Sequence, residues 1–389
     1  MATRRPKHGK KILIHDDCRH YRTDRPCRPH KESGVRCPGC PHYDPLKTRV
    51  LVVKLDAIGD VLRTTCLLKP LKAKYPRAEI TWLTRAASAG VLQNNPCIDR
   101  LLVLEGDALV YLQTKRFDVV VNPDTSEPSA RLATLAQGKR KFGFVLDKAE
   151  RLKPLNAAAH DWYRMGLDDA KKKANRRSYQ SIVMDICELP AGEHPILWAV
   201  SEEERSFAAE FLQKAGIDRR RHRVLGFNTG AGGRWAWKKW TLEGYTELAR
   251  RLLAEDPGLR ILLYGGPEEA ARNEELRRVD PSRILDAGSR NSLRQFGALV
   301  DLCDVMVSGD TLGLHVATAL GKKVVCLFGP TSSHEIETYG LIEKISPVGM
   351  DCLCCYLPDC TVRPACMQRI APATVADACR RLMADVRRA

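Results

Sequence analysis

The amino-acid sequence predicts an α/β protein of two facing Rossmann-like domains, and two features of the chain lead to this expectation. Short runs of β-branched and aliphatic residues, which are typical of buried strands, alternate with helical stretches in two separate halves of the chain. The length of 389 residues is also too great for one ordinary core. Open sheets of this kind bind ligands beyond the carboxyl ends of their strands, so we expect the site in a cleft between the domains.

Residues 48–195 form the expected N-terminal domain. The segment TRVLVVKLDAIGD predicts a buried strand and its turn, and VLRTTCLLKPLKAKYP predicts the helix that follows. AEITWLT, RLLVL and FDVVVNP predict further strands. Residues 147–180 interrupt this rhythm with a basic stretch, which fits either a loop or helical excursion beside a cleft or a solvated insertion.

Residues 196–350 repeat the pattern and form the expected C-terminal domain. Ser201 and Glu204 have the spacing of a capping box at the start of its first helix. Strands with glycine-containing turns are predicted by HRVLGFNTGAGG, RILLYGGP, CDVMVSGD and KKVVCLFGPT. The remaining segments are an irregular extension rich in Cys, His, Pro and Arg (1–47) and a cysteine-containing tail with a last helix (351–389).

The formal net charge of +16 is concentrated at the N-terminus, where the first 49 residues hold 13 Lys/Arg against 5 Asp/Glu. Such a surface suits an anionic partner, namely nucleic acid, a phosphorylated glycolipid or an acidic membrane leaflet, and it equally suits a solvated arm that aids solubility. Aromatic residues make up only 6% of the chain, and no recognition-helix or stacking pattern accompanies the charge. We therefore expect no nucleic-acid binding.

The sequence contains no run of about 18 apolar residues, which a membrane-spanning helix would need. Its basic N-terminus, MATRRPKHGKK, lacks the apolar stretch of a secretory signal. We therefore expect a cytoplasmic protein.

Five turns at predicted strand ends combine small, flexible residues with polar ones. They are Ile58–Asp60, Asn228–Gly233, Gly265–Glu269, Ser308–His315 and Gly329–Thr331. Glycine lets the backbone approach a ligand, and the helix N-termini that follow such turns attract phosphate. Neither a Walker A sequence nor GxGxxG is present, so no single turn is specific.

Asp60 follows Gly59 at the tip of the first predicted strand and has two interpretations. It is either a carboxylate that stabilises the first turn of the next helix, by up to about 1 kcal/mol, or a general base facing the cleft. Position alone favours the first interpretation, because such aspartates are common at helix starts.

Polar residues of the second half allow similar pairs of interpretations. Asp310 and Thr311 either cap a helix or bind a ligand, and His315 is either a core histidine or part of that site. Lys238 and Lys239 lie either on a solvated face or, with the glycine-rich backbone, in a diphosphate cradle. Glu268 is a candidate for binding a ribose hydroxyl.

In combination, VVKLDAIGDVLRTTCLLKPLK, NTGAGGRWAWKKW, SGDTLGLHVATALGKKVVCLFGPT and the tail cysteines resemble glycosyltransferase family 9, the ADP-heptose:lipopolysaccharide heptosyltransferases. The resemblance covers residues 48–385 and rests on the set and order of the motifs. It implies the GT-B fold, inversion at the anomeric carbon and transfer without a metal cofactor. It also implies that the last helix returns to the N-terminal domain.

The resemblance assigns roles residue by residue, with Asp60 as the catalytic base. Donor-binding residues on this basis are Thr229, Gly230, Lys238, Lys239, Glu268, Asp310, Thr311, Gly313, His315, Gly329 and Thr331, with Glu269 one position from the expected ribose-binding glutamate. The chain reads DTLGLH, so Leu312 and Gly313 stand where the family usually has glycine and then leucine. Acceptor-side candidates are Arg63, Arg164 and Lys172, which would face a lipid A–core type glycolipid at the inner face of the cytoplasmic membrane.

Of the fifteen cysteines, nine lie near the chain ends, and eight of these form two candidate metal-binding groups. These are Cys18, Cys27, Cys37 and Cys40, and Cys352, Cys355, Cys360 and Cys366. A CxxC suits zinc or an iron–sulfur cluster, whereas separate reduced thiols are the alternative. The N-terminal segment has no core of its own, which favours a structural metal there, with His20, His30 and His42 as substitute ligands. If the chain ends meet, the two groups would be neighbours.

The resemblance therefore implies an inverting heptosyltransferase that uses ADP-heptose and a lipopolysaccharide inner-core acceptor. One alternative is a member of the same family that uses another nucleotide sugar to build a different surface glycan. The other is a non-catalytic assembly protein whose cysteine-rich extension recruits partners. Asp60 together with a basic donor loop argues against a catalytically dead protein.

Overall fold

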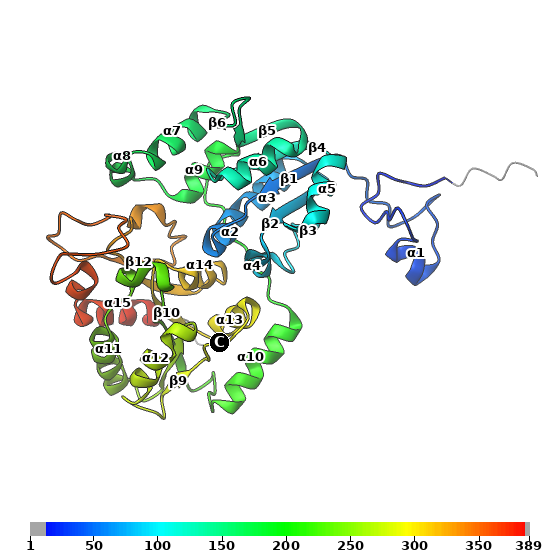
Figure 1. Cartoon of the computed structure of the whole chain (residues 1–389). Coiled ribbons are helices and arrows are strands. Elements are labelled where there is room, and N and C mark those ends of the chain that lie inside the picture. The colour runs from blue at the N-terminus through cyan, green and yellow to red at the C-terminus, as the bar shows by residue number, and fades with distance from the viewer. Residues whose placement is uncertain (1–12, 386–389) are drawn as a thin grey trace, which may run out of the picture.

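Two parallel sheets organise the computed structural model, which describes residues 13–385 (Figure 1). The first sheet has the strand order β3-β2-β1-β4-β5-β6, in which only the β5–β6 hairpin is antiparallel. Its strands are β1 (Thr48–Val53), β2 (Ala78–Thr84), β3 (Arg100–Val103), β4 (Arg116–Asn122), β5 (Gln137–Leu146) and β6 (Leu152–Pro154). β1 lies in the middle, so both of its faces are buried, as its aliphatic sequence predicted.

The second sheet has the equivalent order β12-β11-β10-β7-β8-β9 and is parallel throughout. Its strands are β7 (Arg223–Asn228), β8 (Leu259–Tyr264), β9 (Ile284–Asp286), β10 (Val305–Gly309), β11 (Lys323–Leu327) and β12 (Ile342–Ile345). Each sheet thus belongs to one of the two predicted domains, and each has the doubly wound arrangement expected from alternating strands and helices.

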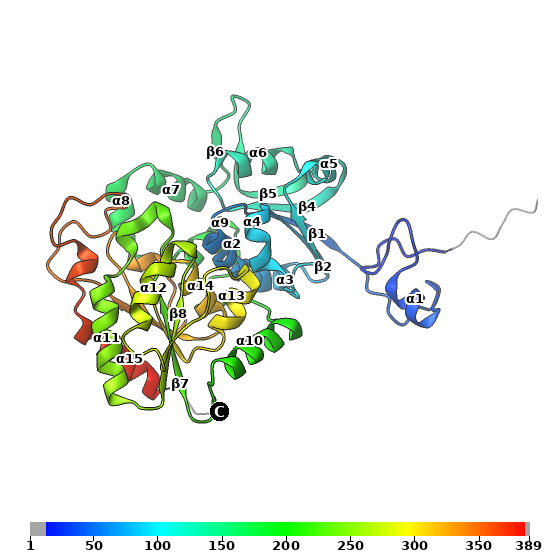
Figure 2. The same ribbon diagram turned by 60° about the horizontal axis from the view of Figure 1, so that its bottom comes forward.

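Helices cover both sheets (Figures 1 and 2). In the first domain they are α2 (Ile58–Thr64), α3 (Leu68–Lys74), α4 (Ala86–Ala89), α5 (Gly106–Thr114), α6 (Glu127–Leu135), α7 (Ala157–Gly166), α8 (Asp169–Ala174) and α9 (Tyr179–Ile186). In the second they are α10 (Glu202–Lys214), α11 (Leu242–Glu255), α12 (Ala270–Arg277), α13 (Leu293–Val300), α14 (Leu312–Ala319) and α15 (Pro372–Ala384). The remaining helix, α1 (Arg28–Ser33), lies in the N-terminal extension.

The first predicted helix is interrupted. A 3₁₀ turn at Thr65–Leu67 separates α2 from α3. Pro70 lacks an N–H group and cannot donate to the carbonyl of Cys66, so the regular ladder breaks at this point. The short α2 presents its N-terminal turn to the second domain.

The two domains share an apolar contact that fixes their relative position. Residues of α2 and of α14 lie in one continuous buried cluster, in which Val61 and Leu62 belong to the first domain and Leu314 and Val316 to the second. A β-carbon added at Gly59 would lie 3.0 Å from Cδ2 of His315, so the helix starts approach closely across the boundary. The turns that carry the candidate site residues therefore face the same region.

The basic stretch between residues 147 and 180 is structured. It contains β6, which forms a hairpin with β5, and the helices α7 and α8, of which α8 lies beside the tail (Figure 1). The predicted capping box at the start of α10 is confirmed, because Ser201 Oγ accepts from Glu204 N and Glu204 Oε2 accepts from Ser201 N.

The expected return of the last helix to the first domain is wrong. α15 packs against α11, β10 and β11 of the second domain, where Val375, Ala376 and Cys379 are buried in that domain's core. The backbone oxygen of Ile370 just before it accepts a hydrogen bond from Trp240 Nε1 at 3.2 Å. The apolar face of α15 is therefore satisfied within the second domain, and the cysteine tail stays there with it.

The two cysteine groups lie at opposite ends of the molecule and are not neighbours. The N-terminal extension projects from the first domain, and the tail wraps the far side of the second (Figures 1 and 2). Within residues 13–385, no helix is long and apolar enough to cross a membrane.

Candidate active site

A cavity of about 330 Å³ lies where the carboxyl end of the first sheet faces the second domain. Most of its lining comes from β1, α2, the β4–α6 loop and helices α7 to α9, and the loop after β11 closes one side. Its polar and aromatic lining residues are Lys54, Asp60, Arg63, Asp124, Thr125, Trp162, Lys172, Tyr179 and Glu335.

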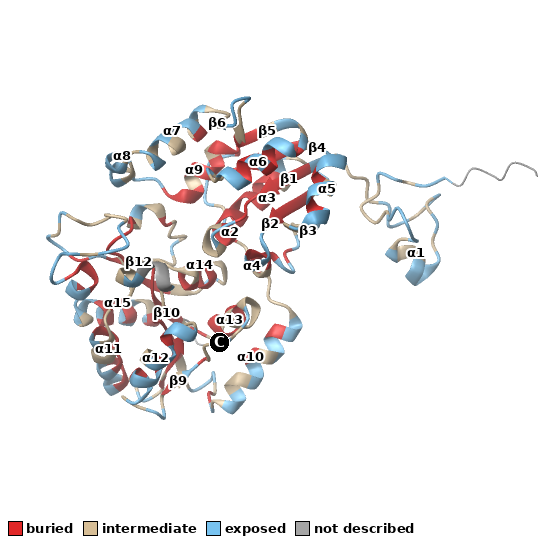
Figure 3. Cartoon of the chain, viewed as in Figure 1, coloured by how far each residue is buried: buried red, intermediate tan, exposed pale blue. Residues whose placement is uncertain are grey.

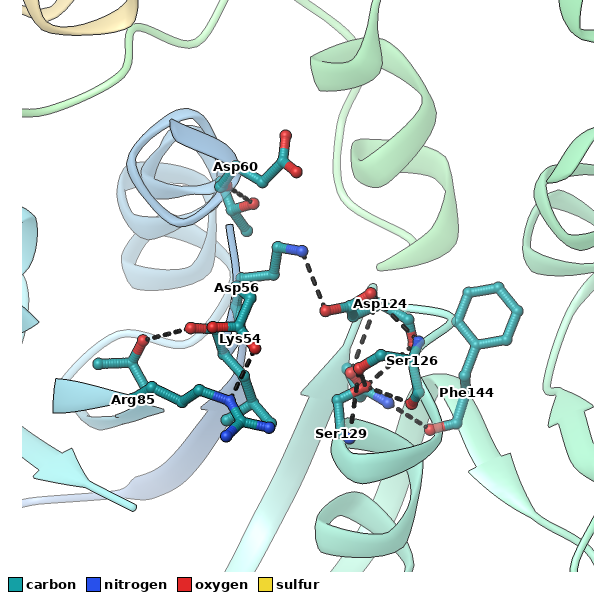
Figure 4. A network of polar contacts seen from close by, with 12 residues as sticks. Lys54, Asp56, Asp60, Arg85, Asp124, Ser126, Ser129 and Phe144 are labelled. Carbon is teal, nitrogen blue, oxygen red and sulfur yellow. Dashed lines mark hydrogen bonds and ion pairs between the residues drawn. The ribbon is translucent and has the colours of Figure 1, made fainter. Parts of the chain in front are cut away.

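Asp60 enters this cavity from the first turn of α2. The N-cap position of that helix is Ala57, and Asp60 lies in the first turn, so its place also fits the helix-stabilising interpretation. Its side chain is 43% exposed, and its Oδ1 lies 3.6 Å from Nη1 of Arg63, one turn further along the helix. The carboxylate is thus open to the cavity on one side and near Arg63 on the other. Figure 4 shows Asp60 on α2.

Arg63 is held in place by both domains. Its guanidinium stacks over the ring of Tyr179 at 3.9 Å, and Nη2 donates to the backbone oxygen of Glu335 at 3.4 Å. The side chain is only 8% exposed. Its Nε is buried without a hydrogen-bond partner among the described residues. Burial raises the pKa of Tyr179 to about 12, so this phenol stays protonated at neutral pH.

A buried ion pair that the sequence analysis missed lies below Asp60. Lys54 ends the aliphatic run of β1, and its Nζ lies 3.0 Å from Oδ2 of Asp124, which follows β4 (Figure 4). Burial alone lowers the pKa of Lys54, but Tyr179, Asp124 and Asp60 raise it above its usual value, so the side chain is charged. The signal that could have revealed this pair is a lysine and an aspartate, each just after a buried strand, because parallel strand ends meet at one edge.

Of the three acceptor-side candidates, two line the cavity and one does not. Lys172 on α8 lines the cavity, with its Nζ 3.6 Å from the ring centroid of Tyr356 in the tail, and Arg63 lines it as described. Arg164 on α7 is exposed and does not line it. Trp162, from the same helix as Arg164, does line it, so α7 presents an aromatic residue rather than its arginine.

On the second domain, Lys238 and Asp310 form a mostly buried pair. Nζ of Lys238 lies 3.0 Å from Oδ2 of Asp310 and 3.2 Å from its backbone oxygen. Burial alone raises the pKa of Asp310, but Lys238, His315 and Arg63 bring it below its ordinary value. Arg63 belongs to the first domain, so its effect on the pKa of Asp310 shows that the Lys238–Asp310 pair lies close to that domain.

His315 is a buried histidine at the contact between the domains. Burial, together with Arg63, lowers its pKa to about 4 against the opposing effect of Asp310 and Asp60, so it is neutral at pH 7. His315 is therefore a core histidine, as one interpretation of the sequence predicted. It also lies next to Asp60, the candidate base, as the other interpretation requires.

A second ion pair joins the β7 loop to the turn after β8. Lys239 Nζ lies 2.6 Å from Oε1 of Glu269, whose Oε2 accepts from the backbone N–H of Gly266 at 2.9 Å. A β-carbon at Gly230 would lie 2.8 Å from the Glu269 carboxyl carbon, so that loop sits directly on this glutamate. Of the two neighbouring glutamates, Glu269 therefore contacts the loop after β7, whereas the side chain of Glu268 is exposed to solvent.

The other donor-side positions cluster around the end of β7. Thr229 donates through Oγ1 to Asn273 Oδ1 at 2.6 Å, and Asn228 donates through Nδ2 to Thr311 Oγ1 at 2.8 Å. A β-carbon at Gly313 would lie 2.7 Å from Asn228 Nδ2, so glycine is needed for α14 to approach β7 this closely. The N-terminus of α14 has no side-chain cap.

The last two donor-side positions face the tail. A β-carbon at Gly329 would lie 2.4 Å from Sγ of Cys366, so this glycine makes room for the cysteine. The backbone oxygen of Gly329 accepts from Cys354 N at 3.0 Å. Thr331 is buried, and its Oγ1 has no hydrogen-bond partner among the described residues.

With this geometry in view, comparison with known proteins identifies the family. The model of glycosyltransferase family 9 (heptosyltransferase) matches residues 110–361, which is more than half of the chain. The chain belongs to glycosyltransferase family 9. It is therefore an enzyme that transfers a glycosyl group, and the predicted alternative of a non-catalytic assembly protein is set aside.

Individual relatives agree with this assignment. The chain is 24% identical over 311 residues to the lipopolysaccharide core heptosyltransferase OpsX of Haemophilus influenzae, across 76% of this chain and 83% of that protein. A family 9 glycosyltransferase of Veillonella parvula has a similar structure, with a TM-score of 0.72 and 19% identity over 87% of this chain and 98% of that one. The ADP-heptose lipopolysaccharide heptosyltransferase II of Escherichia coli gives a TM-score of 0.61 and 20% identity, over 86% and 98% of the two chains. At such identities these structures confirm the GT-B fold.

The cysteines of this family 9 chain do not form a closed metal site as they stand. Among residues 13–385, no three His, Cys, Asp or Glu side chains are gathered closely enough to hold an ion. In the tail, burial raises the pKa of Cys366 to about 11, and the nearby Cys360, Cys355 and Cys352 add to this effect. The predicted metal binding therefore stays a prediction for both groups.

Proposed function

We propose that this glycosyltransferase moves heptose from ADP-heptose to the inner core of lipopolysaccharide, with inversion and with Asp60 as the general base. The observation that carries the proposal is the state of the three carboxylates that line the cavity. Asp124 is held by Lys54, and Glu335 accepts from the hydroxyl of Tyr356 at 2.7 Å. Asp60 is 43% exposed and lies 3.6 Å from its nearest cation, so it keeps an oxygen for a substrate proton.

His315 is the obvious competitor for the role of base, and it fits poorly. A pKa of about 4 makes it a weak base at neutral pH, and its ring is packed against the backbone at Gly59. A base must come within hydrogen-bond reach of the hydroxyl it deprotonates, which an exposed carboxylate in an open cavity can do.

In the proposed reaction the acceptor hydroxyl gives its proton to Asp60 as its oxygen attacks the anomeric carbon from the face opposite the nucleotide. The bond between that carbon and the diphosphate oxygen breaks, and ADP leaves with the electron pair. The uncapped N-terminus of α14 stabilises the negative charge that the leaving diphosphate gains. Lys238 and Lys239, which Asp310 and Glu269 hold in place, donate to the diphosphate. The reaction requires no metal ion, and undiminished activity in EDTA would be the expected result.

The donor assignment draws on the relatives, because the structurally similar E. coli enzyme is named for ADP-heptose and lipopolysaccharide, and OpsX for the lipopolysaccharide core. The acceptor assignment also draws on charge. Lys54, Arg63 and Lys172 all line the cavity, which suits an acceptor that carries phosphate or carboxylate near the reacting hydroxyl. Such an acceptor is a membrane glycolipid, so we place the enzyme at the cytoplasmic face of the inner membrane.

Donor turnover by the purified protein tests the proposal. ADP-heptose and a panel of UDP- and GDP-sugars are offered with a lipid A–core acceptor, and wild type is compared with Asp60→Ala and with Asp56→Ala. Asp56 is a matched control, because it is an aspartate in the loop just before α2 and pairs with Arg85 instead of lining the cavity.

Transfer from ADP-heptose that is lost only in Asp60→Ala is the expected result. Transfer from a different donor would keep the mechanism and replace the substrate with that of the alternative considered from the sequence. Full activity of Asp60→Ala would show that Asp60 is not the general base.

A further inference from the structure

Residues 13–47 of the N-terminal extension are ordered, although they contain no hydrophobic core. None of residues 13–47 is buried, and Figure 3 shows no red in this part of the chain. Helix α1 contributes no buried residue, and Leu13 and Ile14 are 59% and 51% exposed. A unit of about 35 residues without buried apolar side chains cannot be held together by the hydrophobic effect.

Contacts with the rest of the protein do not replace such a core. Arg19 pairs with Asp99 and donates to the backbone oxygen of Ala78 at 3.3 Å, and Lys47 N donates to the backbone oxygen of Arg77 at 3.2 Å. These are a few polar contacts at the surface, and each is worth about 1 kcal/mol or less. These contacts position the extension on the first domain, but they are too few to stabilise its fold.

The backbone of the extension nevertheless closes on itself. Cys18 and Pro45 form an antiparallel bridge, flanked by hydrogen bonds from Arg19 N to Asp44 O at 2.8 Å and from Leu46 N to Asp17 O at 2.7 Å. The chain between these points surrounds a cavity of about 830 Å³. A cross-link inside this cavity would supply the missing stabilisation.

All four N-terminal cysteines line that one cavity, although they come from separate stretches of chain. They are Cys18, Cys27, Cys37 and Cys40, and all four are free thiols in the structure. Cys37 and Cys40 are joined by a tight turn, in which Cys40 N donates to Cys37 O at 3.2 Å and Gly39 has a φ of +72°. Such a turn directs two sulfurs toward one point, as in metal-binding knuckles.

The surroundings of the cysteines suit the charge that a thiolate-bound metal would carry. Four thiolates around a divalent zinc ion, or around a [4Fe–4S] cluster in its 2+ state, leave a net charge of about −2. Arg22, Arg25 and Arg36 line the same cavity and oppose that charge. His30 is also in the lining, with Nδ1 2.9 Å from the backbone oxygen of Val35, which orients its ring as histidines near metals are oriented.

We infer that Cys18, Cys27, Cys37 and Cys40 bind one zinc ion or one iron–sulfur cluster through four thiolates, and that this metal folds the extension. The four sulfurs are not yet close enough to ligate an ion together, so they draw inward around the metal and release their protons as they bind. The extension projects from the side of the first domain opposite to α7, α8 and α9, which line the catalytic cavity (Figure 1). The metal site is therefore a structural element of the extension and takes no part in glycosyl transfer.

Metal analysis of the full-length chain tests this inference. The protein is purified both in air and without oxygen, and the anaerobic sample is also reconstituted with iron and sulfide. Zinc, iron, acid-labile sulfide and the visible spectrum are then measured. Cys37→Ser/Cys40→Ser is the test variant. Cys355→Ser/Cys360→Ser controls for the tail group, and Cys97→Ser controls for an unrelated half-buried cysteine.

The inference predicts about one zinc, or about four iron and four sulfide, that disappear from the test variant and persist in both controls. In a second measurement, removal of the metal with a chelator makes the arginine-rich extension at least about tenfold more sensitive to trypsin while the two domains stay intact. This readout does not depend on how well a serine variant folds.

Two results would overturn the inference. One is a full-length protein that holds no metal after either purification or reconstitution, including a protein whose N-terminal cysteines have instead formed disulfides. The other is metal that the Cys37→Ser/Cys40→Ser variant retains in full, because the metal would then be bound elsewhere.

Discussion

The charged side chains of the two halves of the cleft differ in how far they are paired and how far they are exposed. On the second domain, Lys238 pairs with Asp310 and Lys239 with Glu269, and all four side chains are no more than 21% exposed. The first domain has one such pair, Lys54 with Asp124, but its Asp60 side chain is 43% exposed and lies 3.6 Å from Nη1 of Arg63. A half with fixed, paired charges is suited to holding a ligand in one orientation, whereas an open carboxylate beside a cation is suited to proton transfer. The contrast supports our proposal that the second domain holds the donor and that the first domain acts on the acceptor.

The largest effect that this comparison predicts comes from the open carboxylate. Replacing Asp60 with asparagine keeps the shape of the side chain and removes the base, so we expect kcat to fall by about 10²–10⁴. Steady-state kinetics with saturating donor and acceptor measure the change. Asp56→Asn serves as the control and is expected to leave kcat within about twofold of wild type, because Asp56 forms a surface pair with Arg85. A kcat equally reduced in both variants would show that the loop, and not the base, was disturbed.

The next effect comes from breaking a paired charge on the second domain. Glu269→Gln leaves Lys239 mostly buried without a carboxylate, so we expect a loss of about 3 kcal/mol in the free energy of unfolding and a rise of about tenfold in the donor KM. Urea unfolding and donor titration measure the two effects. Glu268→Gln is expected to change neither, since Glu268 is exposed. If Glu268→Gln raised the donor KM and Glu269→Gln did not, Glu268 would be the ribose-binding residue, as the sequence analysis expected.

A smaller effect concerns the boundary between the halves. The pKa of His315 is lowered from 6.5 to about 4 in the folded protein, so between these values the unfolded chain binds more protons. Stability therefore rises with pH in this window, and acidification from pH 7 to pH 5 costs about 2 kcal/mol through this residue. Chemical unfolding at several pH values should show a flatter dependence for His315→Gln than for wild type. Parallel curves would mean that His315 is not held neutral by its position.

The smallest effect distinguishes two basic residues of neighbouring helices. Lys172→Ala removes a cation from the cavity, and we expect the KM for a phosphorylated acceptor to rise by about three- to tenfold with little change in kcat. Arg164→Ala is the matched change on the preceding helix and is expected to have no effect, because Arg164 does not line the cavity. Equal effects of the two substitutions would indicate a diffuse electrostatic attraction in place of a specific contact.

Much of this arrangement could be predicted from the sequence. The alternation of aliphatic strands and helices predicted both sheets, and the order of the turns placed Asp60, Lys238, Asp310 and His315 near one another. These features depend on local patterns and on the rule that ligands bind at the carboxyl ends of parallel strands, which need no knowledge of tertiary contacts.

Other features depend on which surfaces meet, and these could not be predicted. Lys54 looked like the end of a buried strand, and only the neighbouring strand end shows that Asp124 neutralises it. The choice between Glu268 and Glu269 depends on the position of a single helical turn. The last helix was expected on the wrong domain, because an amphipathic helix such as α15 is compatible with any apolar partner and its contact with α11 is decided by the fold.

The most direct test of the central claim is to measure donor binding and turnover on the same preparation of Asp60→Asn. Isothermal titration gives the Kd of ADP-heptose, and product formation with the lipid A–core acceptor gives kcat. If the first domain acts on the acceptor and the second holds the donor, the Kd stays within about threefold of wild type while kcat falls by about 10²–10⁴. A Kd weakened as much as kcat would contradict the account, because Asp60 would then belong to the donor site.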